Sequence, residues 1–211
     1  MSALMLNRRP IKSRSLSVFQ KLAAWLVSTS ITPNQISIGS IGFALFGALA
    51  LLWVPGWAGL VICALAIQLR LLCNLLDGMV AVEGGKKSAL GDLYNELPDR
   101  ISDALLLVAL GYAAGVIWLG WLAALLAMLT AYIRVLGGAL NLAQDFRGPQ
   151  SKSQRMAVMT GACLLAALSI PWDLQQGVLF AALAVIALGS AWTCYARLAA
   201  MAVLLTNPTK E

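Results

Sequence analysis

Apolar segments of transmembrane length recur along the whole chain, and this repetition limits the fold more than any other feature. Each segment approaches the roughly 20 residues that a helix needs to cross about 30 Å of hydrocarbon. Because lipid offers the backbone no hydrogen-bond partners, helices are the only plausible spanning form. We therefore predict an all-α polytopic membrane protein with six transmembrane helices, at residues 35–54, 57–77, 100–118, 120–142, 156–172 and 177–204.

The composition of the chain supports this class. The 211 residues are 60% hydrophobic and 11% charged, and the mean hydropathy is +0.82. A water-soluble core of this size could not hide so much apolar surface. A secreted protein with a cleaved signal is not expected, because apolar segments recur throughout and no small-residue cleavage site follows the first of them. The four cysteines form no CxxC pair and the chain has no His, so neither a disulfide framework nor a zinc site is expected.

The basic residues divide the connections between the spans into two sets. Three connections, at 54–56, near a bend at Leu119 and at 171–176, hold no Lys or Arg. The other connections and both termini carry the basic residues Arg8, Arg9, Lys12, Arg14, Lys21, Lys86, Lys87, Arg100, Arg147, Lys152, Arg155 and Lys210. By the positive-inside rule, this second set faces the cytoplasm. We predict a multi-pass protein of the bacterial inner (cytoplasmic) membrane, with both termini and the active site on the cytoplasmic side.

The net charge of +6 could also indicate a nucleic-acid partner. Basic residues beside apolar spans, however, usually set topology or meet anionic lipid headgroups. We therefore expect membrane lipids as partners and no nucleic acid.

An amphipathic stretch precedes the first span. Apolar residues recur there at helical spacing beside a lysine, in the set Leu16, Phe19, Lys21, Leu22, Trp25 and Leu26. This pattern is typical of a helix that lies in the membrane interface. Pro33 then suits a turn or the first turn of the next helix. We divide the chain into an N-terminus with the interfacial helix at 1–34, a six-span domain at 35–204 and a cytoplasmic tail at 205–211.

Ionisable residues lie in or beside the cytoplasmic halves of the second, third and fourth spans. They are Arg70, Asp77, Asp99, Arg100, Asp103 and Arg134. Charges at membrane depth are costly, so they usually face a bundle interior or a wet cavity and mark a functional site.

Four oxygen-bearing side chains in this region are spaced for two helix faces. Asn74 and Asp77 are three residues apart, and Asn95 and Asp99 are four residues apart. If the two helices pack antiparallel, these side chains converge, and the small residues Gly78, Ala81 and Gly91 allow close backbone approach. Hard oxygen ligands without sulfur or imidazole favour Mg²⁺ or Mn²⁺. The predicted metal ligands are Asn74, Asp77, Asn95 and Asp99.

The segment 74–99 resembles the CDP-alcohol phosphatidyltransferase motif, D-x2-D-G-x2-A-R-x8-G-x3-D-x3-D, with the same spacing throughout. The matching positions are Asp77, Gly78, Ala81, Gly91 and Asp99. The departures are Asn74 and Asn95 at the first and third Asp positions and Val82 at the Arg position. The chain is similar to a bacterial branch of the family that also has Asn at these two positions. The likeness extends over nearly the whole chain, and includes Thr32-Pro33-Asn34 before the first span and the basic residues Arg134, Lys152 and Arg155.

The resemblance implies a reaction and roles for individual residues. An alcohol attacks the phosphorus on the lipid side of a CDP-linked donor, usually CDP-diacylglycerol, and CMP leaves. Asp99 acts as the general base, and Asp77 is the main carboxylate ligand of the metal. Donor or acceptor contacts are implied for Thr32, Asn34, Gly78, Ala81, Gly91, Arg134, Lys152 and Arg155. Homodimers are common in the family.

Several alternatives remain open at the level of sequence. Arg134 either holds a phosphate or neutralises Asp77 or Asp103 as a structural ion pair. Lys152 and Arg155, with Arg147, either set topology or form a pocket for an anionic acceptor. Lys86 and Lys87 either replace the guanidinium missing at Val82 or set topology.

The metal count and the overall function also have alternatives. Two amides in place of carboxylates remove two negative charges, so we expect one tightly bound ion or a weaker second one. The spare carboxylates Asp92 and Glu96 point about 100° away from the predicted ligand face. The second class of function is a non-catalytic scaffold or a small transporter derived from the same fold. The acceptor alcohol cannot be identified from the sequence.

Overall fold

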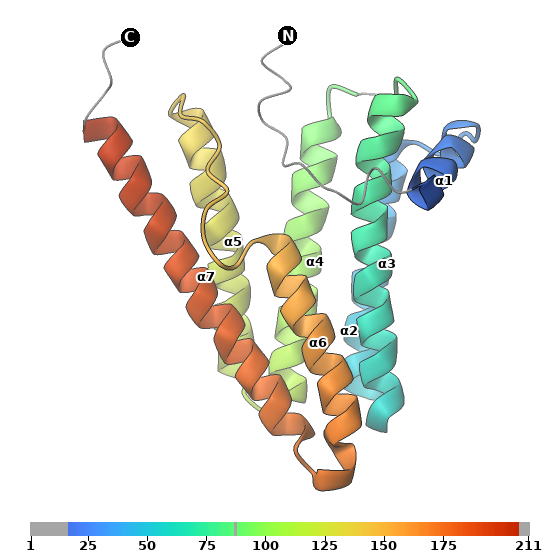
Figure 1. The fold of residues 1–211 in the computed structure, drawn as a ribbon, viewed down its shortest axis with the longest axis vertical. Coiled ribbons are helices and arrows are strands. Elements are labelled where there is room, and N and C mark those ends of the chain that lie inside the picture. The colour runs from blue at the N-terminus through green and yellow to red at the C-terminus, as the bar shows by residue number, and fades with distance from the viewer. Residues whose placement is uncertain (1–16, 87, 207–211) are drawn as a thin grey trace.

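The computed structural model describes residues 17–86 and 88–206, and this part of the chain is a bundle of helices without strands (Figure 1). The predicted all-α class is therefore confirmed. The elements in chain order are α1 (Ser17–Val27), α2 (Pro33–Trp53), α3 (Gly56–Glu83), α4 (Gly91–Ala113), α5 (Ile117–Ala139), α6 (Lys152–Ser169), a 3₁₀ turn η3 (Ile170–Trp172) and α7 (Gln175–Thr206). The predicted basic N-terminal residues before Ser17, together with Lys87 and Lys210, lie outside the described residues.

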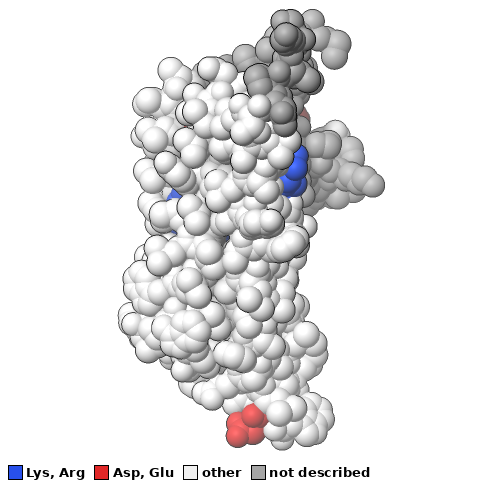
Figure 2. Space-filling view, turned by 90° about the vertical axis from the view of Figure 1, so that its left-hand side faces the viewer, with Lys and Arg blue, Asp and Glu red and all other residues white. Residues whose placement is uncertain are grey.

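Five helical segments of the described chain are long and apolar enough to cross a membrane: α2, α3, α5, α6 with η3, and α7. On the face of the molecule in Figure 2, basic residues show only in the upper half, and the lower half is uncharged down to an acidic residue at its end, as expected for a surface in contact with lipid. Helix α4 lies against α2 and α5, but its first half carries Asp92, Glu96, Asp99, Arg100 and Asp103. The protein is thus a polytopic membrane protein, and the crossing of the membrane by α4 as a sixth span stays a prediction.

One predicted turn between the spans is wrong. The fourth span is expected to follow a bend near Leu119, but Leu119 lies in the first turn of α5. The chain turns instead at 114–116, where Gly115 takes a φ of +72° that favours glycine over other residues. Helix α4 begins at Gly91, before the apolar segment at residue 100, so Asn95 and Asp99 are helical as their spacing predicted.

The helix ends separate into two levels that differ in charge. The lower connections in Figure 1, at 54–55, 114–116 and 173–174, contain one charged residue, Asp173. The upper level holds the end of α3, the start of α4 and the ends of α5 and α7. Helix α6 begins lower than its neighbours, and the segment 140–151 descends from α5 to reach it (Figure 1). The cytoplasmic orientation of the upper end stays a prediction.

Helix α1 packs on α3 at the upper end of the bundle. Its Ala23 and Leu26 are buried in a small apolar cluster with residues of α3, whereas Trp25 is 59% exposed. This split into a buried and an exposed apolar face agrees with the predicted interfacial helix. Leu16, the first residue of the predicted stripe, lies outside the described residues.

Lys86 attaches the end of α1 to the loop after α3. Its Nζ donates hydrogen bonds to the carbonyl oxygens of Val27 at 3.1 Å, Thr29 at 2.8 Å and Ile31 at 3.4 Å. A cation at a helix C-terminus satisfies carbonyls that the helix leaves unpaired. Lys86 therefore does not replace the guanidinium missing at Val82, as one of our alternatives supposed.

We expect Lys86→Met to loosen α1 from the bundle, because three carbonyl oxygens lose their cationic partner. Limited proteolysis with chymotrypsin in nanodiscs should then cleave faster after Trp25, which is exposed on α1. Lys21→Met, on the exposed face of the same helix, is the matched control. Equal cleavage rates in the two variants would contradict the capping role.

Helix α4 is placed by contacts with α2 and α5 rather than by close packing on α3. A Cβ on Gly111 would lie 2.6 Å from the Cα of Gly120, so α4 and α5 touch backbone to backbone at this point. Toward the upper end, side chains from α3 reach α4 and build the polar site described below.

Candidate active site

Asp77 lies in the upper part of α3 and is 5% exposed. The Ser37 hydroxyl of α2 donates a 2.5 Å hydrogen bond to Asp77 Oδ2. A capping box fixes the start of α2, because Thr32 accepts from the Gln35 backbone and Gln35 accepts from the Thr32 backbone. Asp77 also lies within electrostatic range of Asp99 and Lys152. The predicted ligand Asp77 is thus held rigidly beside the predicted base.

Asp99 receives hydrogen bonds from two other helices. Its Oδ1 accepts from Asn74 Nδ2 of α3 at 2.9 Å, and its Oδ2 accepts from Lys152 Nζ of α6 at 2.5 Å. Arg70 Nη2 lies 3.4 Å from Oδ1. The residue is 4% exposed, so both carboxylate oxygens are occupied by donors in a largely water-free setting. The structure therefore brings Asn74, Asp77 and Asp99 together, as their spacing predicted.

Asn95 and Gly91 are placed differently from these three residues. Asn95 is exposed on α4, one turn before Asp99. A Cβ on Gly91 would meet only the Ser88 hydroxyl, at 3.8 Å. The close backbone approach that we expected at Gly91 is therefore wrong, because α4 begins at this residue with open space beside it. Gly78 and Ala81 lie in α3 and are half-buried.

Thr32 and Asn34 make local structural contacts at the start of α2. Thr32 is the N-cap of this helix, and Asn34 Nδ2 donates to Ser88 Oγ at 3.3 Å. The second bond joins the start of α2 to the loop that precedes α4. Both residues lie at the upper end of the bundle, and their predicted contact with donor or acceptor stays a prediction.

Arg134 of α5 pairs with Glu96 of α4, and its guanidinium lies over the Phe146 ring, 5.6 Å from the centroid. The alternative pairing of Arg134 with Asp77 or Asp103 is thus wrong. Glu96 points away from the Asn95 face, as helical geometry predicted, and reaches α5 instead. Arg100 lies 3.6 Å from the other Glu96 oxygen.

Arg155 is 1% exposed, and its guanidinium has partners within the protein. Its Nη2 lies 2.8 Å from Asp103 Oδ2, and its Nη1 donates to the Gln150 carbonyl at 2.7 Å. The guanidinium therefore faces the protein interior rather than an open pocket.

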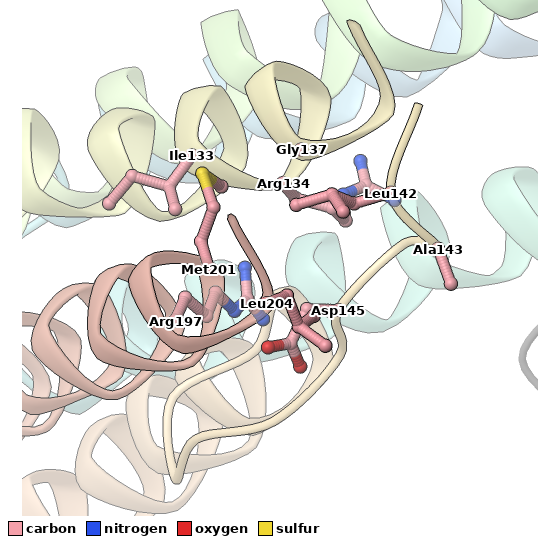
Figure 3. A pocket seen from close by; sticks show the side chains of 9 residues that line it. All are labelled: Ile133, Arg134, Gly137, Leu142, Ala143, Asp145, Arg197, Met201 and Leu204. Carbon is pink, nitrogen blue, oxygen red and sulfur yellow. The ribbon is translucent and has the colours of Figure 1, made fainter. Parts of the chain in front are cut away.

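Sequence reasoning missed Arg197, which lies in α7. Its Nη1 donates to the Thr130 carbonyl at 2.6 Å and its Nε to the Arg147 carbonyl at 3.0 Å. With Arg134 it lines a cavity of about 20 Å³ between α5, α7 and the segment after α5 (Figure 3). A lone Arg inside the apolar run 177–204 was the signal that could have found it.

The donor set fits a hard divalent ion. Asp77 and Asp99 supply carboxylate oxygens and Asn74 an amide oxygen, whereas the predicted ligand Asn95 is exposed one turn before Asp99. Within the described residues, no group of three or more Asp, Glu, His or Cys side chains is gathered as a ligand set. Asn74 turns its amide nitrogen to Asp99, so ligation requires a half-turn of this amide. The arrangement suits one ion centred on Asp77 better than two.

A family model described as CDP-alcohol phosphatidyltransferase matches residues 30–204. The chain belongs to this family, which confirms the predicted family and enzyme class. It is 28% identical over 188 residues to the inner membrane protein YnbA of Escherichia coli, covering 89% of this chain and 92% of that one. It is 32% identical over 167 residues to the archaetidylinositol phosphate synthase of Aeropyrum pernix, covering 78% and 81%.

Solved structures of the Mycobacterium tuberculosis phosphatidylinositol phosphate synthase PgsA1 share the fold. The structure with CDP-DAG bound has a TM-score of 0.76 at 21% identity, and the match covers 92% of this chain and 96% of that chain. The complex with manganese and citrate also has a TM-score of 0.76, at 22% identity, and covers 90% of each chain. At these identities the likeness shows the fold.

Proposed function

We propose that the protein transfers a phosphatidyl group from CDP-diacylglycerol to an alcohol and releases CMP in phospholipid biosynthesis. The observation that carries this proposal is the buried Asp99 carboxylate, which lies beside Asp77 and is contacted by Asn74 and Lys152. We further propose that the upper end of the bundle faces the cytoplasm of a bacterial inner membrane, because the lower connections hold one charge, Asp173.

The residues that would hold the metal with the donor pyrophosphate are Asn74, Asp77, Asn95 and Asp99. A divalent ion such as Mg²⁺ or Mn²⁺ would supply positive charge there for the pyrophosphate and for the departing CMP. Ser37 keeps Asp77 oriented through its 2.5 Å hydrogen bond. The mycobacterial neighbour with CDP-DAG bound supports a CDP-linked lipid as donor.

Asp99 is the general base in this proposal. The alcohol oxygen forms a bond to the phosphorus on the lipid side, the bond from that phosphorus to the CMP oxygen breaks, and the alcohol proton passes to Asp99. Oδ2 becomes available when Lys152 moves away, and Lys152 can do so because its side chain is 28% exposed. A donor phosphate is a suitable new partner for the ammonium group.

A phosphorylated alcohol is the acceptor that the charges favour. Arg134 and Arg197 lie on one small cavity, and Arg197 has only backbone carbonyls as hydrogen-bond partners in the described chain. Release of Arg134 from Glu96 would widen the cavity of about 20 Å³ for a phosphate group. The names of the Aeropyrum and mycobacterial relatives support a phosphorylated polyol such as inositol phosphate.

The test is to incubate the purified protein with CDP-diacylglycerol, Mg²⁺ or Mn²⁺ and a panel of alcohols, while CMP release and the product mass are followed. The panel contains inositol phosphate, glycerol phosphate, their unphosphorylated parents and serine. CMP release only with phosphorylated alcohols would support the proposal in full. Absence of CMP release with every acceptor would favour the scaffold or transporter alternative.

Calorimetric titration with Mn²⁺ in the absence of substrate should detect one tight site per chain. The two amides leave only Asp77 and Asp99 as acidic ligands, and Lys152 already occupies one Asp99 oxygen. Asn74→Asp combined with Asn95→Asp should strengthen a second site, because each substitution adds a carboxylate. Two equally tight sites in the wild-type protein would contradict this prediction.

A further inference from the structure

Three buried charged residues join α3, α4 and α6 next to the proposed active site. Arg70 Nη2 lies 2.7 Å from Asp103 Oδ1, and Arg155 Nη2 lies 2.8 Å from Asp103 Oδ2. The side chains of Arg70, Asp103 and Arg155 are 0%, 3% and 1% exposed. One carboxylate from α4 thus holds two guanidinium groups, one from each neighbouring helix. We call these three residues the buried triad.

The buried triad is connected directly to Asp99. Asp99 and Asp103 lie one turn apart on α4, and Arg70 Nη2 is shared between them. The same nitrogen lies 3.3 Å from the Asp99 backbone carbonyl. Arg70 therefore holds, from α3, the turn of α4 that runs from Asp99 to Asp103.

The buried triad also holds the second partner of Asp99. Arg155 donates to the Gln150 carbonyl at 2.7 Å and to Thr130 Oγ1 at 3.3 Å. These bonds attach the start of α6 to α5 and to the segment that precedes α6. Lys152, whose ammonium contacts Asp99 Oδ2, lies in the same first turn of α6. Helices α3 and α6, whose side chains contact the Asp99 carboxylate, are thus both held by the Asp103 side chain.

Stability alone does not account for this arrangement. Two buried arginines share one carboxylate, and Arg70 Nε, Arg70 Nη1 and Arg155 Nε have no hydrogen-bond partner among the described residues. Apolar side chains of similar volume often stabilise a core as well as a buried ion network does, or better. Burial of these charges therefore gives the bundle no clear gain in stability over apolar side chains. The exact positions of the three helices are a second reason for such a network.

We propose that Arg70, Asp103 and Arg155 are positioning residues that fix Asp99 for proton transfer. The inference rests on the proposed function, in which Asp99 is the base. None of the three touches the reacting atoms. Their role is to keep the Asp99 carboxylate and Lys152 at the right place and angle, so their loss lowers kcat and leaves donor affinity nearly unchanged.

The test replaces the triad by apolar residues of comparable size, in the triple variant Arg70→Met, Asp103→Leu and Arg155→Met. Removal of all three charges leaves no unpaired ion in the core, so this variant should fold. We expect kcat for CMP release to fall about 100-fold, the effect of a misplacement of roughly 1 Å. The CDP-diacylglycerol Kd, measured by calorimetry, should change less than about threefold. Thermal stability by fluorescence-detected chromatography should stay near that of the wild type.

The matched control removes another polar link between α3 and α6. Gln68 Nε2 donates to Thr160 Oγ1 at 2.8 Å on an exposed face, and the double variant Gln68→Met and Thr160→Val should keep the wild-type kcat. Arg70→Lys is a second test that keeps the charge, because an ammonium cannot reproduce the planar contacts of a guanidinium. It should lower kcat with little change in KM.

The outcomes separate the inference from the function on which it rests. Wild-type kcat in the triple variant or in Arg70→Lys would overturn the positioning role and leave the proposed function intact. A fall in donor affinity as large as the fall in kcat would overturn it too, because the triad would then act on binding. Absence of CMP release from the wild-type protein with every acceptor would overturn the proposed function, and the inference with it.

Discussion

Asp99→Asn should lower CMP release at least about 100-fold, because an amide cannot take the proton of the attacking alcohol. The substitution keeps the shape of the side chain and an oxygen that can still accept from Lys152 or Asn74. The fold and the donor affinity should therefore change little. CMP release under saturating donor and acceptor measures the first effect, and calorimetry with CDP-diacylglycerol measures the second.

Asp92→Asn is the matched control for this substitution. Asp92 lies in the first turn of the same helix and is exposed, so its neutralisation should leave turnover unchanged. If the Asp99 variant turned over at the wild-type rate, the assignment of the base would be wrong. If it lost donor affinity and turnover together, Asp99 would act mainly as a ligand of the metal and donor.

The pairing of Lys152 with Asp99 gives the free enzyme a closed state. The ammonium lies 2.5 Å from Oδ2 and Asn74 donates to Oδ1, so both carboxylate oxygens are occupied by donors. In the proposed function, an anionic donor would offer Lys152 a second partner and would free Asp99. Donor binding and access to Asp99 would then be coupled through the Lys152 side chain.

The sequence allowed the class of fold and the centre of the site to be predicted. Apolar segments of transmembrane length require helices whatever their packing. Asn74 and Asp77 share a helix face because the helical repeat places residues three apart on the same side. These features depend on residues that are close together in the sequence, so they can be predicted from a single sequence.

The contacts between distant helices could not be predicted in this way. The charges of Arg70 and Asp103 were visible in the sequence, but 33 residues separate them along the chain and only the packing brings them together. The partner of Arg134 was mistaken for the same reason, since Glu96 reaches it only in the folded bundle. Arg197 was overlooked because a single charge in α7 carries no spacing pattern.

Asp77→Ala should weaken metal binding and donor binding together. Asp77 is the carboxylate on which the ion and, through it, the donor pyrophosphate depend in the proposed function. Loss of a residue that only orients a metal ligand typically lowers metal affinity by about 10- to 100-fold. Removal of the ligand itself should therefore reduce Mn²⁺ affinity at least about 100-fold. Calorimetry with Mn²⁺, and then with CDP-diacylglycerol in its presence, measures both effects.

Ser37→Ala is the graded control, because it removes the 2.5 Å hydrogen bond that orients Asp77 and keeps the carboxylate. We expect its loss of Mn²⁺ affinity to be about tenfold. Equal effects of the two substitutions would mean that Asp77 acts on the metal only through the local structure. Unchanged Mn²⁺ affinity in Asp77→Ala would remove Asp77 from the ligand set, and the ion would then have to rest on Asp99, whose two oxygens already bind Asn74 and Lys152.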